Sequence, residues 1–387
     1  MQITVLRERQ EGETRVALIP DSVKKLAAIE GVTLFVESQA GEHAGAEDEE
    51  YVAAGATVGD DVEQALAATD LLLCVNRPTP EHVAALKPGS ILAGMFRPLD
   101  EPTALASAVE GKVTIFALEL VPRITRAQSM DVLSSMATVI GYKAAVMAAE
   151  FLGRMFPLLM TAAGTSPPAR VLVLGAGVAG LQAIATAKRL GAQVEGYDIR
   201  AAAGEQVRSL GAGFLEVDLE GIETEDAGGY ATELTEEAQQ RGRDLITKQA
   251  AVSDVIITTA QIPGRKAPLL LTKEAVMGMR PGSIVVDLAG LNGGNCELSK
   301  PGEEVRVKEV MVVTPLNLAA TVAVDASLLY SRNMASFVEA LLRNGLQDGR
   351  IVPDLEDSVL GPTCMAHDGK VVHERVAAAI ASQKEGS

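Results

Sequence analysis

The sequence predicts an α/β protein with two parallel-sheet domains joined by long helices, the first domain being discontinuous. The chain has 387 residues, enough for two domains of ordinary size. Short runs of Val, Ile and Leu alternate with longer amphipathic stretches, as buried parallel strands alternate with helices. Since 48% of the residues are hydrophobic, 22% are charged and 36 are glycines, the chain can bury two cores and pack helices closely on sheets.

The first domain is expected over residues 1–130, with a helix at Asp21–Ile29 and proline-rich turns between its strands. The predicted strands are the apolar runs Ile3–Leu6, Leu34–Val36, Leu71–Val75, Ser90–Ala93 and Thr114–Ala117. A long apolar helix is expected over Asp131–Phe156. Because Lys143 and Glu150 lie inside it, we interpret it as a buried or linking helix and not as a membrane span.

The second domain is expected over residues 131–324, with a loop at 163–168 before its first strand. Its predicted strands are Arg170–Leu174, Gln193–Asp198, Gly213–Val217, Val255–Thr259, Ser283–Leu288 and Val310–Val313. Residues 219–251 begin with an acidic, glycine-containing stretch that indicates an exposed loop before a polar helix. A last helix at Asp325–Leu342 is expected to return the chain, so that residues 325–387 complete the first domain.

Charge and composition exclude several functions. The net charge is −17, and a field of that sign repels nucleic acid and anionic lipid, so no nucleic-acid partner is expected. The three cysteines are isolated and the four histidines are scattered, which predicts neither a disulfide framework nor a metal site. The first residues form a strand-like run without a basic and then apolar signal, so we expect a cytoplasmic protein.

Residues 170–198 contain every part of a dinucleotide-binding fingerprint. An apolar strand leads into Gly175, Gly177 and Gly180 in G-x-G-x-x-G spacing, an amphipathic helix follows, and Asp198 ends the next strand. Gly175 permits the tight turn, Gly177 lets the backbone approach a pyrophosphate, and Gly180 allows close packing of helix on strand. The N-terminus of the helix would direct unpaired N–H groups at the phosphates, and Val178 is counted with the cofactor contacts. The domain is therefore predicted to be Rossmann-like, as is the first.

The end of the second strand in this unit bears on the choice between NAD and NADP. Asp198 is placed to accept hydrogen bonds from ribose hydroxyls and to repel a 2′-phosphate, whereas Arg200 would attract one. Because Asp198 ends the strand itself, we favour NAD(H) as the cofactor. Ile199 lies between the two and is counted with the cofactor contacts.

A polar cluster precedes the long apolar helix. It contains Arg123, Arg126, Gln128, Ser129 and Asp131. In one interpretation Ser129 or Asp131 caps the helix and the two arginines are solvated. In the other, the cluster is a clamp between the domains, in which Arg123 binds a pyrophosphate or carboxamide and Gln128 and Asp131 orient a nicotinamide ring. The chemistry of these residues supports both interpretations equally.

Several motifs over nearly the whole chain carry a family resemblance. They are Arg123–Asp131, the fingerprint with Tyr197–Arg200, Gly228–Ala231, Thr258–Arg265 and Gly293–Cys296. With them the chain resembles the NAD(H)-binding alpha subunit, domain I, of proton-translocating nicotinamide nucleotide transhydrogenase. That family shares its fold with alanine dehydrogenase, and Glu13–Pro20 is a motif common to both.

The resemblance implies that NADH bound here gives a hydride to NADP⁺ on a separate NADP-binding subunit, while a membrane-spanning subunit couples the exchange to proton translocation. The chain would then lie on the inner face of the plasma membrane through its partners, as a homodimer. Arg123, Gln128, Asp131 and Ser134 would position the nicotinamide. Gln261 and Gly229 would contact the cofactor, and Tyr230 would be the tip of a mobile loop hinged at the glycines, an ordinary loop aromatic being the alternative.

Direct hydride transfer needs no general acid or base, and this separates the chain from alanine dehydrogenase, whose family uses a Lys and a His in the first domain. Here Asn76 stands where that Lys is expected, and residues 92–98 contain no His. Arg15 is interpreted as a structural ion-pair partner, with a vestigial carboxylate site as the alternative. An amino-acid dehydrogenase and a non-catalytic NAD-binding regulator remain the competing functions.

The sequence departs from the family pattern at three places near strand ends. These are residues 288–295, residues 314–324 and Gln261, which stands where an aliphatic residue is expected. We expect nicotinamide contacts and docking of the NADP-binding partner to differ most there.

Overall fold

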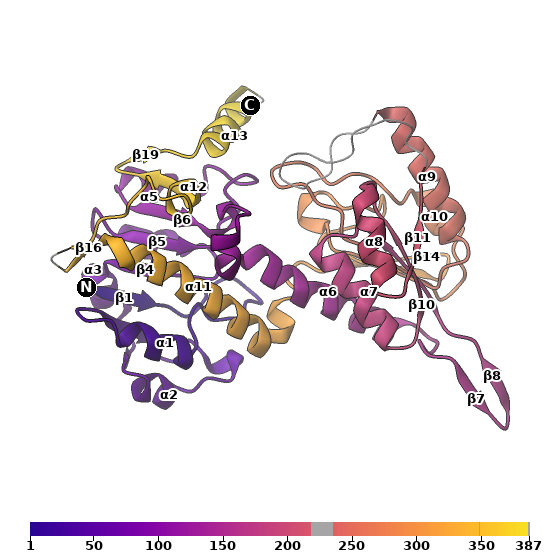
Figure 1. Cartoon of the computed structure of the whole chain (residues 1–387), viewed down its shortest axis with the longest axis horizontal. Helices are drawn as coiled ribbons and strands as arrows, with labels where there is room; N and C mark the ends of the chain where they lie inside the picture. The colour runs from indigo at the N-terminus through magenta and orange to yellow at the C-terminus, as the bar shows by residue number, and fades with distance from the viewer. Residues whose placement is uncertain (218–234, 348, 386–387) are drawn as a thin grey trace. The chain divides into compact units, whose positions relative to one another are not determined.

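The computed structural model describes residues 1–217, 235–347 and 349–385. These residues form two compact units (Figure 1). The first unit consists of Met1–Met136 and Ala319–Ser387, and the second of Ala137–Leu318. Each unit is an α/β structure built on its own sheet, as the sequence predicts.

The first unit contains an eight-stranded sheet in the order β19-β18-β6-β5-β4-β1-β2-β3. Its strands are β1 (Gln2–Val5), β2 (Thr33–Glu37), β3 (Thr57–Gly59), β4 (Leu71–Leu73), β5 (Ile91–Gly94), β6 (Thr114–Ala117), β18 (Cys364–His367) and β19 (Lys370–Val371). The strands from β6 to β3 are parallel, whereas β18 and β19 add antiparallel to the β6 edge.

Helices cover both faces of this sheet because each presents an apolar stripe to it. They are α1 (Pro20–Ala27), α2 (Asp48–Ala53), α3 (Val62–Ala68), α4 (Pro80–Ala84), α5 (Ala106–Glu110), α11 (Ala323–Gly345), α12 (Leu360–Thr363) and α13 (Glu374–Glu385), with 3-10 turns η1 (Glu42–Ala44), η2 (Leu118–Leu120), η3 (Thr125–Met130) and η5 (Ala320–Val322). Residues of α3, α4, α5 and α13 share one core with the sheet. On α11, the Phe337 ring packs edge-on to Phe116 of β6, with ring centroids 5.3 Å apart. The hairpin β16 (Leu346–Gln347) and β17 (Arg350–Ile351) follows α11.

The second unit contains a seven-stranded sheet in the order β11-β10-β9-β12-β13-β15-β14. Its strands are β9 (Arg170–Leu174), β10 (Gln193–Tyr197), β11 (Gly213–Leu215), β12 (Val255–Thr258), β13 (Ile284–Asp287), β14 (Glu304–Val307) and β15 (Val310–Val313). All pairs are parallel except β14 with β15, so a single antiparallel strand closes one edge.

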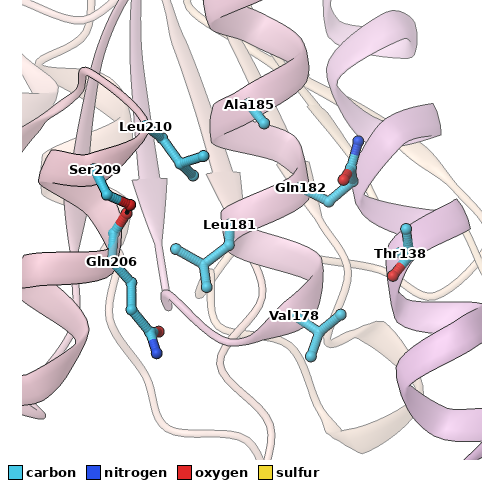
Figure 2. Close-up of a pocket in the computed structure, with 8 residues that line it drawn as sticks. All are labelled: Thr138, Val178, Leu181, Gln182, Ala185, Gln206, Ser209 and Leu210. Atoms are coloured by element: carbon cyan, nitrogen blue, oxygen red, sulfur yellow. Dashed lines mark hydrogen bonds between the residues drawn. The ribbon is translucent and has the colours of Figure 1, made fainter.

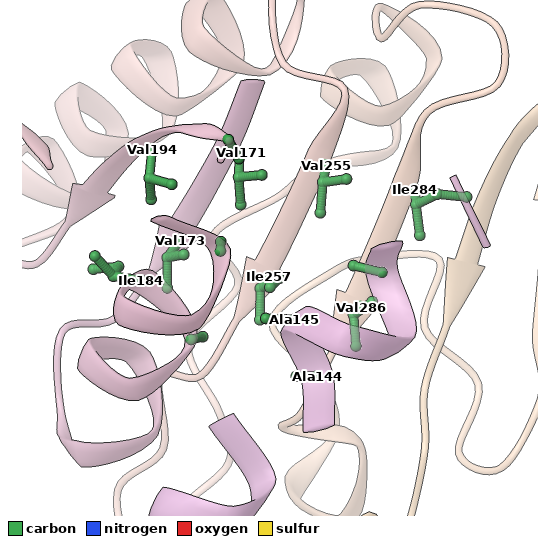
Figure 3. Close-up of a cluster of buried hydrophobic side chains, with 14 of the residues drawn as sticks. Ala144, Ala145, Val171, Val173, Ile184, Val194, Val255, Ile257, Ile284 and Val286 are labelled. Atoms are coloured by element: carbon green, nitrogen blue, oxygen red, sulfur yellow. The ribbon is translucent and has the colours of Figure 1, made fainter. Parts of the chain in front are cut away.

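Two hydrophobic cores hold helices to the two faces of this second sheet. The helices are α6 (Val132–Phe151), α7 (Val178–Arg189), α8 (Ala201–Ser209), α9 (Glu236–Ala250) and α10 (Lys273–Met277), with the 3-10 turn η4 (Gly290–Asn292). Small residues such as Ala144 and Ala145 of α6, with Ile184 of α7, pack on Val173 and Ile257 of the sheet (Figure 3). Residues of α9 and α10 pack on the alternate strand positions, among them Leu172 and Ile256. The nearly continuous apolar strands are thus buried on both faces.

The structure differs from the expected elements at the end of α6. This helix ends at Phe151 instead of Phe156, shortly before Gly153, a poor helix former. The expected loop at 163–168 is part of a hairpin, β7 (Leu159–Thr161) and β8 (Gly164–Ser166), which extends away from the second sheet in Figure 1. Within the described ranges, only α6 is long and apolar enough to cross a membrane, a test that core helices of soluble proteins also pass.

Candidate dinucleotide site

The turn between β9 and α7 carries the fingerprint glycines. Gly175 has φ +98°, a left-handed conformation, and a β-carbon there would lie 2.6 Å from Thr259 Oγ1. At Gly180 a β-carbon would lie 1.8 Å from the carbonyl oxygen of Gly175. At Gly177, in contrast, a β-carbon would meet nothing within 4 Å. The chain itself therefore requires glycine at 175 and 180, whereas Gly177 presents bare backbone to open space.

The start of α7 fits an anion. Gly177 is its N-cap, with extended backbone, and among the described residues no side chain bonds to the first turn as a cap. Val178, the first residue of the helix, is 43% exposed. Unpaired N–H groups and the positive end of the helix dipole meet at this point, which is the arrangement that binds phosphate in nucleotide-binding turns. The residues present therefore fit a pyrophosphate.

Asp198 follows β10 and is held by the chain on both carboxylate oxygens. Oδ2 accepts a hydrogen bond from Ala176 N at 2.7 Å, and Oδ1 accepts one from Arg200 N at 2.9 Å. The Arg200 guanidinium adds two bonds of 2.9 Å, from Nε to Oδ1 and from Nη2 to Oδ2. Asp198 therefore ties the glycine turn to Arg200 and pairs that positive charge. Ile199, between them, is partly buried against the α9 side of the core.

Gln261 lies in the loop after β12, and its side chain donates from Nε2 to the Leu288 carbonyl at 2.5 Å. Leu288 is the first residue after β13, so this bond joins two neighbouring strand ends. The side chain of Gln261 is exposed. An aliphatic residue could not make this bond, by which Gln261 ties the loop after β12 to the loop after β13.

In the first unit, the polar cluster around residue 123 surrounds the start of α6. Asp131 Oδ1 accepts from Ser134 N at 2.9 Å, and its Oδ2 accepts from Ser134 Oγ at 2.5 Å. This is an N-cap, so the capping interpretation of Asp131 is confirmed. Arg123 and Gln128 are exposed on the same segment, and Arg126 pairs with Asp357 at 2.7 Å.

Arg15 forms a buried ion pair with Glu13, as the sequence predicts. Nε and Nη2 donate to the two Glu13 oxygens at 2.7 and 2.6 Å, and Nη1 lies 3.2 Å from Met136 Sδ. Asn76 Nδ2 also donates to Glu13, at 2.7 Å. The carboxylate that meets Arg15 is thus supplied by the chain itself.

The structure brings the fingerprint residues together in the second unit, where Asp198 links Ala176 of the glycine turn to Arg200. Arg123, Gln128, Asp131 and Ser134 all lie within the first unit, where hydrogen bonds join Asp131 to Ser134. Tyr230, Gly228 and Gly229 lie outside the described residues. In the part of the chain that the structure describes, no group of three or more His, Cys, Asp or Glu side chains could hold a metal ion.

A hollow of about 320 Å³ opens beside the fingerprint helix (Figure 2). Side chains of α6, α7 and α8 line it: Thr138, Val178, Leu181, Gln182, Ala185, Gln206, Ser209 and Leu210. None of these side chains carries a charge, so the lining offers no ionic partner for a phosphate. This hollow therefore does not match the chemistry of the phosphate-binding turn.

Comparisons with known proteins agree with this geometry. The family described as alanine dehydrogenase/PNT matches with its N-terminal domain over residues 4–140 and its C-terminal domain over residues 144–374. The chain is 45% identical over 379 residues to an NAD(P) transhydrogenase subunit alpha chain of Rhodospirillum rubrum, covering 96% of this chain and 98% of that protein.

Two solved structures are similar over nearly their whole length. A transhydrogenase structure from Sinorhizobium meliloti matches with a TM-score of 0.86 and 40% identity, covering 96% of this chain and 100% of that one. An L-alanine dehydrogenase matches with a TM-score of 0.81 and 26% identity, covering 99% of both chains. These similarities confirm the predicted family resemblance and the Rossmann-like α/β fold.

Proposed function

Because the chain belongs to the family of NAD(P) transhydrogenase alpha subunits, we propose that it is the NAD(H)-binding subunit of a proton-translocating transhydrogenase. The family makes it an oxidoreductase subunit. The observation that carries the proposal is the glycine turn, in which Gly177 is open while Gly175 and Gly180 are sterically required. Such a turn suits a dinucleotide pyrophosphate.

We assign the cofactor contacts to the two strand ends around that turn. The backbone at Gly177 and Val178 would receive the pyrophosphate, and Asp198 would receive the adenosine ribose. Because Asp198 is a carboxylate and already pairs Arg200, a 2′-phosphate would meet a negative charge, and the neighbouring arginine would already be paired with that charge. This favours NAD(H) over NADP(H) here, with NADP(H) on the partner subunit.

When bound, NADH supplies a hydride from its nicotinamide ring. A hydride moves without an exchangeable proton, so the chain's residues need only hold the ring, orient it and exclude water. Arg123, Gln128, Asp131 and Ser134 are proposed as these positioning residues, with Tyr230, Gly229 and Gln261 completing the contacts. Since Glu13 already pairs Arg15, the arginine that could meet the carboxylate of an amino-acid substrate is engaged within the chain.

Partners follow from the subunit role. An NADP-binding subunit would receive the hydride, and a membrane-spanning subunit would couple the exchange to proton movement, holding this chain at the cytoplasmic face of the membrane. We also propose a homodimer. In the second unit, large apolar side chains are exposed on α6 and the segment that follows, namely Tyr142, Met155, Leu158 and Met160, the last being 76% exposed.

Hydride exchange in a reconstituted mixture tests the function. The full chain, mixed with its NADP-binding partner, should transfer hydride from NADH to an NADP⁺ analogue, and no exchange with a verified partner would refute the proposal. Arg123→Ala should slow exchange at least tenfold while leaving NADH affinity nearly unchanged. Arg126→Ala is the matched control, because it removes a neighbouring exposed arginine that forms an ion pair with Asp357.

A further inference from the structure

Asn295 clamps a backbone segment at the carboxyl edge of the second sheet. Its side chain is fully buried, and Oδ1 accepts from Ala260 N at 3.0 Å. Nδ2 donates to the carbonyls of Ala260 at 2.9 Å and Pro268 at 2.8 Å. The amide thus satisfies both backbone groups of Ala260, as a neighbouring strand would do.

Asp287, the last residue of β13, fixes Asn295 in turn. Its buried carboxylate accepts from the backbone N–H of Asn295 at 2.8 Å and of Cys296 at 3.0 Å. It also accepts from Thr258 Oγ1 at 2.8 Å, at the end of β12. The loop after β13 is therefore folded around one carboxylate, and this places the Asn295 amide against the end of the next strand.

The residue before Ala260 touches the glycine turn directly. Thr259 Oγ1 donates to the Gly175 carbonyl at 3.0 Å, and Thr259 N donates to the Leu174 carbonyl at 2.8 Å. Gly175 also has its β-side closed by Thr259 and Ala260, whose N lies 3.1 Å from a β-carbon there. Residues 259–260 therefore pack directly against the left-handed turn at Gly175 and support it.

We propose that Asn295 is a positioning residue for dinucleotide binding. By holding Ala260 on both backbone groups, it keeps Thr259 under Gly175, and the turn keeps its N–H groups directed toward the phosphate. The proposal rests on the proposed binding of NAD(H). It assigns to the loop after β13 a role in the phosphate end of the site, in addition to any contact with the nicotinamide end.

The test replaces the amide by an isosteric carboxylate, Asn295→Asp. The oxygen that replaces Nδ2 would then face the carbonyls of Ala260 and Pro268 as an acceptor in place of a donor, while Oδ1 would still accept from Ala260 N. Thr259→Val acts at the other end of the same link by removing the hydroxyl that bonds Gly175. Asp254→Asn is the matched control, since Asp254 is a buried clamp at the opposite end of β12, accepting from Arg170 N at 2.8 Å and Arg154 Nη1 at 2.9 Å.

Two measurements on the full chain decide the matter. Without nucleotide, amide hydrogen exchange at residues 175 and 176, whose N–H groups bond to Tyr197 O and Asp198 Oδ2, should speed up at least tenfold in Asn295→Asp and in Thr259→Val, but not in Asp254→Asn. The Kd values for NADH and for ADP should rise at least tenfold in the first two variants only, even where Asp254→Asn lowers Tm as much.

Unchanged exchange at residues 175 and 176 in both variants would overturn the proposal, as would an equal loss of affinity in Asp254→Asn. If Asn295→Asp does not fold, Thr259→Val alone decides by the same criteria. A wild-type chain that binds no NADH contradicts the proposed function, whereas the exchange data still report whether Asn295 holds the turn.

Discussion

Replacing Gly177 and Gly180 by alanine, one at a time, distinguishes a glycine that phosphate binding requires from a glycine that folding requires. The two residues are three positions apart in the same turn, and their surroundings are opposite. A β-carbon at 177 meets nothing within 4 Å, whereas a β-carbon at 180 lies 1.8 Å from the Gly175 carbonyl oxygen. Gly177→Ala should therefore affect binding, and Gly180→Ala should affect folding.

The magnitudes follow from the local backbone. Gly177 has φ −76° and ψ −169°, which alanine adopts without strain, so Gly177→Ala should change the free energy of unfolding by no more than ~0.5 kcal/mol. Its methyl group would occupy the space through which a pyrophosphate approaches, raising the Kd for NADH at least tenfold, about 1.4 kcal/mol. Gly180→Ala gains about 1 kcal/mol of helix propensity, but the 1.8 Å contact with backbone puts the overpacking cost at the upper end of its usual range, about 3 kcal/mol, so the net loss is about 2 kcal/mol.

Urea unfolding and NADH fluorescence titration of the two variants and the wild type measure both effects. We expect Gly177→Ala to unfold with the wild-type midpoint and to bind NADH weakly, and Gly180→Ala to unfold earlier. If Gly177→Ala bound NADH as tightly as the wild type, the turn would not be the pyrophosphate site. A Gly180→Ala protein of wild-type stability would contradict the steric argument itself.

Three further changes have definite expected outcomes. Asp198→Asn removes the charge that pairs Arg200, so the preference for NADH over NADPH, measured as a ratio of Kd values, should fall about tenfold or more. Burial raises the pKa of Glu119 from 4.5 to about 7, so the stability that its protonated form supplies is lost as the pH rises from 4.5 through 7. Glu119→Gln should remove that loss. In urea unfolding the variant should therefore be more stable than the wild type by about 2–3 kcal/mol at pH 8 and equally stable at pH 4. Glu13→Gln leaves Arg15 buried without its charge partner, which should lower the free energy of unfolding by about 3 kcal/mol and produce no amino-acid-dependent NADH formation.

The parts of the fold that the sequence predicts are those with local causes. Strand Arg170–Leu174 and its glycine turn are readable because the apolar run, the glycine spacing and the following helix are adjacent in the chain. Strands β18 and β19 carry no such signal. Each is short, and β18 becomes a strand by pairing antiparallel with β6, about 250 residues earlier in the chain, so its conformation depends on a distant partner.

The domain junctions show a similar limit. The pattern of predicted helices places them at 130/131 and 324/325, whereas the compact units divide at 136/137 and 318/319. Helix α6 runs through the first junction without interruption, since Val132–Phe151 belongs to both units. A boundary inside a continuous helix leaves no glycine, proline or polar linker to mark it.

Site residues also differ in how far the sequence predicts their contacts, according to whether their partners are near or distant in the chain. Asp131 could be predicted as a cap because the N–H that it accepts belongs to Ser134, three residues on. Asn295 could be recognised only as part of a family motif, because its partners Ala260 and Pro268 come from another loop. The sequence pattern is enough to put Asp198 at a strand end, but its bonds to Ala176 and Arg200 appear only in three dimensions.

The buried clamps near the two ends of strand β12 give a physical reason why we propose nucleotide binding at only one edge of this sheet. Asp254 at its amino end and Asn295 beyond its carboxyl end both satisfy backbone groups of neighbouring segments, so both stabilise the sheet. At the amino edge the bonded segment is the regular start of β9, whose first N–H is taken by Asp254 itself and whose residues then pair in the ladder. At the carboxyl edge the supported segment is the turn at Gly175, where the chain leaves the ladder and α7 begins with N–H groups that have no intrahelical partner. The same kind of clamp is therefore structural at one end of β12, and at the other it also holds the groups that an anion would bind.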